Sequence, residues 1–341
     1  MASRSWSRDE GVLKSELAGA ATGLSVPRSL VPGRRRGVWG DRLYQAAVRA
    51  AVLVFVVVVL GIAALLVYAA RPALAAFGWR FLVTADWDPV AEHFGALPFV
   101  YGTLVSALLG MLIAVPFGVG AAIYLAELAP VWIRPPVAFL VELLAAIPSV
   151  VYGLWGIFVL APLLRSWVQP GLARGLGFLP LFQGTPYGVG MLAAGIILAI
   201  MVVPFIVAVS REVLLAVPTQ QREAALALGA TRWETTRLAV LRYARSGLLG
   251  AILLGLGRAL GETMAVTMVI GNRPEIALSL FAPGYTMASV IANEFTEATS
   301  DLYLAALIEI GLLLFVVTVA VNALARLLVW SVGGAVKEVR E

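Results

Sequence analysis

The sequence predicts an all-α, polytopic membrane protein with six transmembrane helices, and three observations support this. Of its 341 residues, 61% are hydrophobic and only 13% are charged, whereas about a quarter of the residues in a soluble chain are charged. Mean hydropathy is +0.93. Six apolar runs are long enough to cross about 30 Å of hydrocarbon as helices. They are far too long for barrel strands, and a helix satisfies its own backbone hydrogen bonds in lipid.

The six runs differ in the charges they carry. The first, second and fourth have no charge, the third contains Glu142, the fifth contains Arg258 and Glu262, and the sixth contains Glu309. The runs cover residues 50–70, 94–126 (with the helix starting near Pro98), 135–164, 187–209, 246–272 and 302–325. We expect Pro116 and Pro148, inside the second and third runs, to be tolerated packing features that can kink their helices.

Basic residues predict the orientation of these helices. With a cytoplasmic amino terminus, 19 of the 25 lysines and arginines fall on the cytoplasmic side and 5 on the other, with Arg258 inside the membrane. This imbalance places both termini in the cytoplasm of a multi-pass plasma-membrane or inner-membrane protein. We divide the chain into a flexible basic tail (1–45), a first transmembrane helix (46–71), an external loop (72–96), a main transmembrane domain (97–330) and a cytoplasmic tail (331–341).

Several chemistries are excluded by composition. The chain has no cysteine, so it lacks thiolate metal sites and cysteine nucleophiles. Its single histidine, His93, cannot form a multi-histidine metal site. Neither Lys14 nor Lys337 follows a glycine, so the chain has no Walker A loop for ATP. We expect no catalytic residue, metal site or cofactor in this chain, and the net charge of +5 reflects topology rather than nucleic-acid binding.

Two of the runs carry a small residue at every fourth position. Such a flat stripe lets another helix approach closely. We favour packing over a smooth wall lining a passage. The stripes are Gly102, Ser106, Gly110, Ala114, Gly118 and Ala122 in the second run, and Gly247, Ala251, Gly255 and Ala259 in the fifth.

The segment between the fourth and fifth runs, 211–247, is unusually polar. Pro218 suits the first turn of a helix, and Gly229 supplies its stop. Thr231 and Glu234 have the spacing of a capping box, so a second helix should begin there and lead into the fifth run. The pattern predicts a helix, a glycine turn and a second helix, although a solvated connector is as good an explanation of the geometry alone.

Residues Glu223, Ala224 and Ala225, followed by Gly229, resemble the EAA loop of permease subunits of ABC importers. The family pattern continues with Ile-x-Leu-Pro, where this chain has Ala239, Leu241 and Arg242 for Ile, Leu and Pro. The resemblance implies a type I ABC importer permease fold. It also implies that loop 211–245 contains a coupling helix whose surface, from Glu223 to Gly229, docks on a cytoplasmic ATPase.

Two further stretches, 141–153 and 257–272, are similar to permeases of phosphate importers. The resemblance implies uptake of inorganic phosphate by a heterodimer of this chain and a second permease. The other partners would be two ATPase copies, which hold ATP and Mg, a phosphate-binding protein and membrane lipid, with no nucleic acid. One alternative is a permease for sulfate or molybdate. A second is an ion-coupled secondary carrier, which is disfavoured because we detect no internal repeat of the kind found in many such carriers. A third alternative is an intramembrane enzyme.

The charged residues inside the runs are the candidate substrate pathway. An arginine such as Arg258 at the centre of a span costs about 2.5–3.5 kcal/mol. Glu262, four residues later, should lie on the same helical face and pair with it. Either the two form a structural pair, or the guanidinium meets phosphate oxyanions while Glu262 orients it. Glu142 is a further pathway candidate, with pairing to a neighbouring helix equally favoured. Glu309 lies two turns into the sixth run from the outer side, where it could reach interfacial water.

Overall fold

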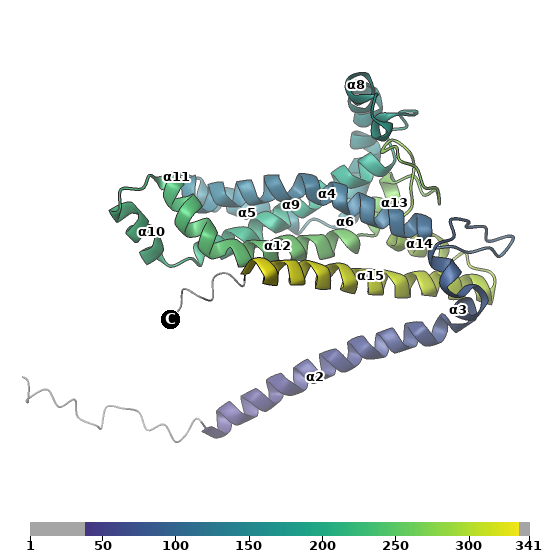
Figure 1. The fold of residues 1–341 in the computed structure, drawn as a ribbon, viewed down its shortest axis with the longest axis horizontal. Helices are drawn as coiled ribbons and strands as arrows, with labels where there is room; N and C mark the ends of the chain where they lie inside the picture. The colour runs from purple at the N-terminus through teal and green to yellow at the C-terminus, as the bar shows by residue number, and fades with distance from the viewer. Residues whose placement is uncertain (1–37, 334–341) are drawn as a thin grey trace, which may run out of the picture. The chain divides into compact units, whose positions relative to one another are not determined.

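In a computed structural model, the described part of the chain, residues 38–333, consists of helices joined by turns (Figure 1). Two isolated β-bridges and no strands occur in this part. Six of its helices are long and apolar enough to span a membrane, which confirms the all-α, six-span prediction. These spans are Gly40–Ala69, Leu97–Leu128, Ser149–Leu176, Met191–Leu215, Arg232–Leu260 and Asp301–Leu327. Most of tail 1–45 and most of tail 331–341 lie outside the described residues, and the parts inside them, 38–45 and 331–333, are helical.

The chain divides into two compact units, one up to Gly61 and one from Ile62 onward. The α-helices are α2 (Val38–Ala69), α3 (Arg71–Phe77), α4 (Leu97–Ile123), α5 (Arg134–Ala145), α6 (Ser149–Trp155), α7 (Ala161–Leu163), α8 (Gln169–Leu176), α9 (Met191–Leu215), α10 (Thr219–Ala227), α11 (Arg232–Thr235), α12 (Leu241–Leu260), α13 (Met264–Val269), α14 (Met287–Glu294) and α15 (Asp301–Gly333). Short 3₁₀ segments are η2 (Gly78–Leu82) and η6 (Pro180–Phe182). Single π-helical turns are η3 (Tyr124–Leu128), η4 (Gly156–Leu160), η5 (Leu164–Val168) and η7 (Thr236–Val240).

Helix α9 is the centre of the second unit, and α4, α5 and α12 pack against it. The small-residue stripes of α4 and α12 form these contacts. A Cβ atom added at Gly118 would lie 2.8 Å from the Ile206 side chain, and one at Gly247 would lie 2.5 Å from Val213. Real Cβ atoms do not approach so closely, so the glycines permit the helix spacing. The stripes are therefore packing surfaces, as we favoured.

The third apolar run is not one continuous span. Helix α5 ends at Ala145, and Pro148, with φ −58° and ψ 138°, precedes the next helix. The residue before a proline disfavours the α conformation, so the helix stops before Ile147 instead of kinking at Pro148. The third span then runs from Ser149 to Leu176, so the predicted boundaries, 135–164, were wrong.

The fifth run is also broken. Its helix begins upstream, at Arg232, and ends at Leu260. After Gly261, the short helix α13 starts at Met264, and a Glu262 side-chain oxygen accepts a hydrogen bond of 3.2 Å from the Ala265 amide near its first turn. The prediction of one helix over 246–272 was therefore wrong.

Candidate coupling site and charged residues of the spans

The polar segment after α9 folds as a helix, a glycine turn and a second helix. Pro218 directly precedes α10, and Thr231 directly precedes α11, which continues through η7 into α12. This segment lies at one end of the helices of the second unit, with α14 at the opposite end (Figure 1). The predicted helix–glycine–helix arrangement is therefore confirmed, and the alternative, a solvated connector, is not what the structure has.

Gly229 ends α10 in a left-handed conformation, with φ +87°. The Ala230 amide donates to the Ala225 carbonyl at 3.2 Å, and the Gly229 amide donates to the Leu226 carbonyl at 2.9 Å. This pair of bonds is the Schellman motif, in which a residue with positive φ satisfies carbonyls at a helix end. The glycine is thus required by backbone conformation, since no atom lies within 4 Å of the position its Cβ would take.

The second helix starts with the predicted capping box. The Thr231 hydroxyl accepts a hydrogen bond from the Glu234 amide at 3.3 Å, and the Glu234 carboxylate accepts one from the Thr231 amide at 2.8 Å. Each bond satisfies an amide that a helix start leaves without a partner. Thus both ends of the turn, at Gly229 and at Thr231, have fixed geometry.

The EAA residues lie on the open surface of this turn. Glu223, Ala224 and Gly229 are exposed, and Ala225 is half-buried. No residue of α10 is buried, and the apolar side chain of Leu228 is 90% exposed. The four EAA positions therefore belong to one accessible element. Their role in docking an ATPase stays a prediction.

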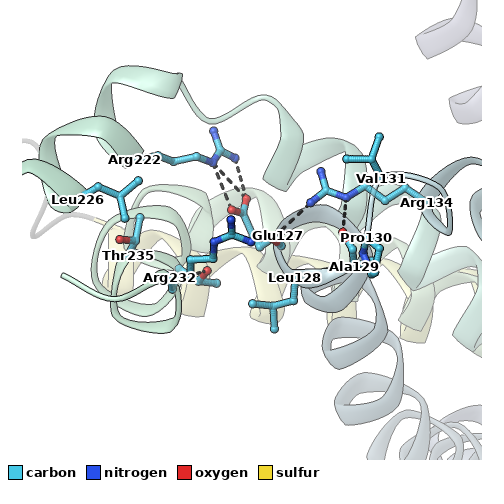
Figure 2. Close-up of a pocket in the computed structure, with 11 residues that line it drawn as sticks. Glu127, Leu128, Ala129, Pro130, Val131, Arg134, Arg222, Leu226, Arg232 and Thr235 are labelled. Carbon is cyan, nitrogen blue, oxygen red and sulfur yellow. Dashed lines mark hydrogen bonds and ion pairs between the residues drawn. The ribbon is translucent and has the colours of Figure 1, made fainter. Parts of the chain in front are cut away.

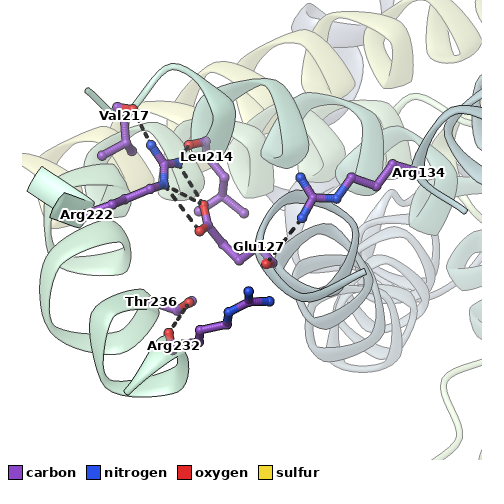
Figure 3. Close-up of polar contacts among 7 residues, drawn as sticks. All are labelled: Glu127, Arg134, Leu214, Val217, Arg222, Arg232 and Thr236. Atoms are coloured by element: carbon purple, nitrogen blue, oxygen red, sulfur yellow. Dashed lines mark hydrogen bonds and ion pairs between the residues drawn. The ribbon is translucent and has the colours of Figure 1, made fainter. Parts of the chain in front are cut away.

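Arg222, immediately before the EAA residues, forms an ion pair that the sequence analysis missed. Its Nη2 atom lies 2.7 Å from a carboxylate oxygen of Glu127 in η3, and the two side chains are 20% and 10% exposed (Figure 3). The partners are 95 residues apart in sequence. A charge-assisted, largely desolvated contact of this kind is stronger than an exposed surface pair.

The same guanidinium also binds the end of α9. Its Nη1 atom donates to the Val217 carbonyl at 2.5 Å, and Nη2 donates to the Leu214 carbonyl at 2.8 Å (Figure 3). The last carbonyls of a helix have no partners within it, so arginine is a suitable donor there. One side chain therefore joins α10 to the ends of both α4 and α9.

The expected Arg258–Glu262 ion pair is absent from the described residues. The helix ends between the two positions, so the i, i+4 geometry that would pair them is lost. Arg258 is exposed in this chain, and its guanidinium carbon lies 5.9 Å from the centre of the Phe205 ring. This contact is a cation–π interaction near the upper limit of its range. The Arg258 guanidinium therefore has no carboxylate partner among the described residues, and its charge can interact with a group outside α12.

The other two carboxylates are placed differently from expectation. Glu142 is exposed on α5, which the break at Pro148 separates from the third span, and it forms no ion pair among the described residues. Glu309 is only 5% exposed and lines an apolar cavity of about 280 Å³ beside α3. Glu309 is therefore buried within this chain and does not lie at its surface, where it could have reached interfacial water. The pathway roles of Arg258, Glu262 and Glu142 stay predictions.

Comparisons with known proteins assign the family. A family model described as "Binding-protein-dependent transport system inner membrane component" matches residues 114–332. A relative from Mesorhizobium japonicum, 47% identical over 86% of this chain and 90% of its own, is named "Phosphate transport system permease protein PstC". A relative of the same name from Xylella fastidiosa is 47% identical over 90% of this chain and 97% of its own. An inward-facing structure of the MetNI methionine ABC transporter has a TM-score of 0.47 and 20% identity, covering 74% of this chain and 96% of that chain.

The six candidate spans are those of a multi-pass membrane protein, and the family model and the relatives identify it as a component of a transporter. The chain belongs to the family of binding-protein-dependent transport system inner membrane components, the permease subunits of ABC importers. The predicted type I importer fold is thereby confirmed.

The Gly229 turn can be tested by substitution. Gly229→Val should destabilise the turn by about 1–2 kcal/mol because a side chain disfavours positive φ. We expect it to lower the amount of ATPase subunit that co-purifies with this chain and to lower substrate uptake. Gly229→Asn should retain more of both, since asparagine tolerates this conformation. The measurements are the yield of assembled transporter and uptake per complex. Gly120→Ala is the matched control, because Gly120 is helical with no atom within 4 Å of its added Cβ. Equal uptake for the Val and Asn variants would contradict the conformational role.

Proposed function

We propose that this chain is the transmembrane permease subunit of an ATP-driven importer that takes up inorganic phosphate delivered by a substrate-binding protein. The observation that carries the proposal is its similarity, over most of its length, to proteins named as phosphate transport system permeases. The chain is a permease subunit and not the ATPase. ATP and Mg²⁺ act in a partner subunit, since the sequence has no Walker A loop.

The partners follow from the same proposal. The chain forms a heterodimer with the second permease, PstA, on two copies of the ATPase PstB, and receives phosphate from the binding protein PstS. Its termini and the Gly229 turn face the cytoplasm, where the basic residues concentrate. The EAA surface, from Glu223 to Gly229, docks on one ATPase copy.

The contacts of Arg222 support a route for the coupling. Movement of an ATPase subunit displaces α10, and the Arg222 guanidinium passes this displacement to η3 through Glu127. It also passes the displacement to the end of α9 and the turn after it through the Leu214 and Val217 carbonyls. Because α4 and α12 pack closely on α9, they move with it. ATP binding thus changes which side of the membrane the pathway faces.

Arg258 provides the anion contact of this pathway. Its planar donor fork matches two oxygens of phosphate, and an exposed position on α12 leaves it free to meet substrate. Glu262 supports the break after α12 through its bond to the Ala265 amide. Glu142, on α5, is a secondary pathway candidate near the other break.

The function is tested with the assembled transporter in proteoliposomes. Radiolabelled phosphate uptake should require the binding protein and ATP, and a large excess of unlabelled sulfate or molybdate should not compete. Competition by either oxyanion at levels similar to phosphate would assign that substrate instead. Uptake that persists with a catalytically inactive ATPase subunit, driven by an ion gradient, would indicate a secondary carrier. An ATPase and a second permease should co-purify with this chain.

A further inference from the structure

A cavity of about 530 Å³ lies at the foot of α10, between this helix, the turn after η3 and the start of the second helix (Figure 2). It is separate from Arg258 and the other pathway candidates, none of which lines it. Its walls come from five elements, η3, α5, α10, α11 and η7, and from the turn between η3 and α5. The lining residues are Glu127, Leu128, Ala129, Pro130, Val131, Arg134, Arg222, Leu226, Arg232, Thr235 and Thr236.

The charges of this cavity are not balanced. Three arginines, Arg134, Arg222 and Arg232, line it together with one carboxylate, Glu127. Arg222 is paired with that carboxylate at 2.7 Å. Two guanidinium groups therefore share the cavity without an acidic partner among the described residues, and their mutual repulsion favours an anion between them.

Donors remain free on both of these arginines. Arg134 uses Nε for the Ala129 carbonyl at 2.8 Å and Nη2 for a long contact of 3.4 Å to the Glu127 carbonyl, which leaves Nη1 without a partner among the described residues. The Arg232 side chain forms no hydrogen bond or ion pair in the same part of the chain. Figure 3 shows the two guanidinium groups extending toward Glu127 from different elements.

A buried hydroxyl supports the same conclusion. Thr235 is 5% exposed and lines the cavity, and its Oγ1 atom has no hydrogen-bond partner among the described residues. A buried hydroxyl without a partner is unfavourable, and such groups in folded proteins are usually satisfied by protein, water or ligand. The neighbouring Thr236 hydroxyl is already satisfied by the Arg232 carbonyl at 3.0 Å.

The remaining walls indicate which anion fits. Leu128, Pro130, Val131 and Leu226 contribute apolar surface to the walls, and Val131 is 79% exposed next to the end of the second span. Guanidinium groups bind phosphate oxygens through paired hydrogen bonds. We propose that this cavity is a binding site for a phosphate group, carried either by free inorganic phosphate or by the headgroup of an anionic lipid. The bound group joins Arg134 of α5 to Arg232 of α11 and so fixes the base of the coupling segment.

The test uses the full transporter in nanodiscs and follows hydrogen exchange in two peptides, 127–136 and 228–236. One arm adds inorganic phosphate to discs of phosphatidylcholine, and the other replaces part of that lipid with phosphatidylglycerol. Bound phosphate groups should slow exchange in both peptides. Arg232→Gln should weaken the response about tenfold or more in ligand concentration, because it removes a charge-assisted contact. Arg237→Gln is the matched control, since Arg237 is exposed in η7, directly after α11, and does not line the cavity.

The two arms also separate the sources of the group. Protection with inorganic phosphate alone assigns a site for free phosphate, and protection with phosphatidylglycerol alone assigns a lipid site. Protection that is equal in Arg232→Gln and the parent would overturn the proposal. So would the absence of protection in both arms, including the case in which the ATPase subunit already covers these peptides and an acidic side chain of that partner occupies the cavity.

Discussion

Arg222→Gln is expected to reduce phosphate uptake per assembled transporter by roughly 5- to 150-fold while ATP hydrolysis continues, the range of a coupling free energy of about 1–3 kcal/mol. The substitution removes the guanidinium that connects α10 to Glu127, to the Leu214 carbonyl of α9 and to the Val217 carbonyl in the turn after α9. Without it, α10 can move with the ATPase without moving the spans. Uptake and ATP hydrolysis, both normalised to complex, measure the effect.

The size of the stability effect follows from burial. Removing one partner of a fully buried ion pair costs about 3–5 kcal/mol. Because the Glu127 and Arg222 side chains keep 10% and 20% exposure, water screens part of this, and about 1–3 kcal/mol is expected. Glu212→Gln is the matched control, because Glu212 forms an ion pair with Arg211 at 2.6 Å but is 69% exposed.

Exchanging the two charges tests whether the ion pair alone is sufficient, or whether the contacts of Arg222 with the Leu214 and Val217 carbonyls are needed as well. Glu127→Arg combined with Arg222→Glu restores opposite charges, but a glutamate at 222 cannot donate to the Leu214 and Val217 carbonyls. We therefore expect the double variant to remain uncoupled. Recovery of full uptake in it would show that the charge pair alone is sufficient, and normal uptake in Arg222→Gln would show that α10 needs no such connection.

The coupling segment was predictable because its signals are local. A glycine after the last helical residue, and a threonine three residues before a glutamate, each specify backbone geometry within one turn. The structure has the Schellman motif at Gly229 and the capping box at Thr231. The six spans were predictable for a similar reason, since hydrophobic length alone decides whether a helix can cross lipid.

The contact between Glu127 and Arg222 was not predictable in this way. It joins positions 95 residues apart, and nothing in either local pattern specifies the other. Two signals pointed toward it: an acidic residue at the end of an otherwise uncharged run, and an arginine directly before Glu223 that the EAA pattern does not explain. Only the packing of α4 against α9 brings them together.

The breaks in the third and fifth spans were missed because hydropathy does not register them. The residues around Pro148 are largely apolar. Near Gly261 the two charges, Arg258 and Glu262, lie between long apolar stretches, so both runs look continuous. The steric signals were present, since the residue before a proline avoids the α conformation and glycine is a poor helix former. Because the helix ends at Leu260, Glu262 lies beyond the break and on a different segment from Arg258.

The helix break after Leu260 changes the results that we expect from substitutions of Arg258. With no ion pair to Glu262, the structural role left for Arg258 is its contact with Phe205 and with the carboxyl end of α12. If Arg258 instead meets phosphate, Arg258→Gln should lower uptake about 10- to 100-fold, because a charge-assisted hydrogen bond contributes about 1.5–3 kcal/mol. Arg258→Lys should also be strongly impaired, since an ammonium group cannot reproduce the planar fork.

The kinetic form of the defect distinguishes the two roles. The binding protein captures phosphate before this chain meets it, so loss of a pathway contact should lower the maximal rate and leave the half-saturating phosphate concentration nearly unchanged. A structural role predicts that Arg258→Gln and Phe205→Leu both lower the yield of complex, with normal uptake by the complexes that assemble. Arg326→Gln, an exposed arginine on α15, is the control for loss of one positive charge. Full uptake in a well-assembled Arg258→Gln transporter would exclude Arg258 from the pathway and leave it as a packing residue against Phe205.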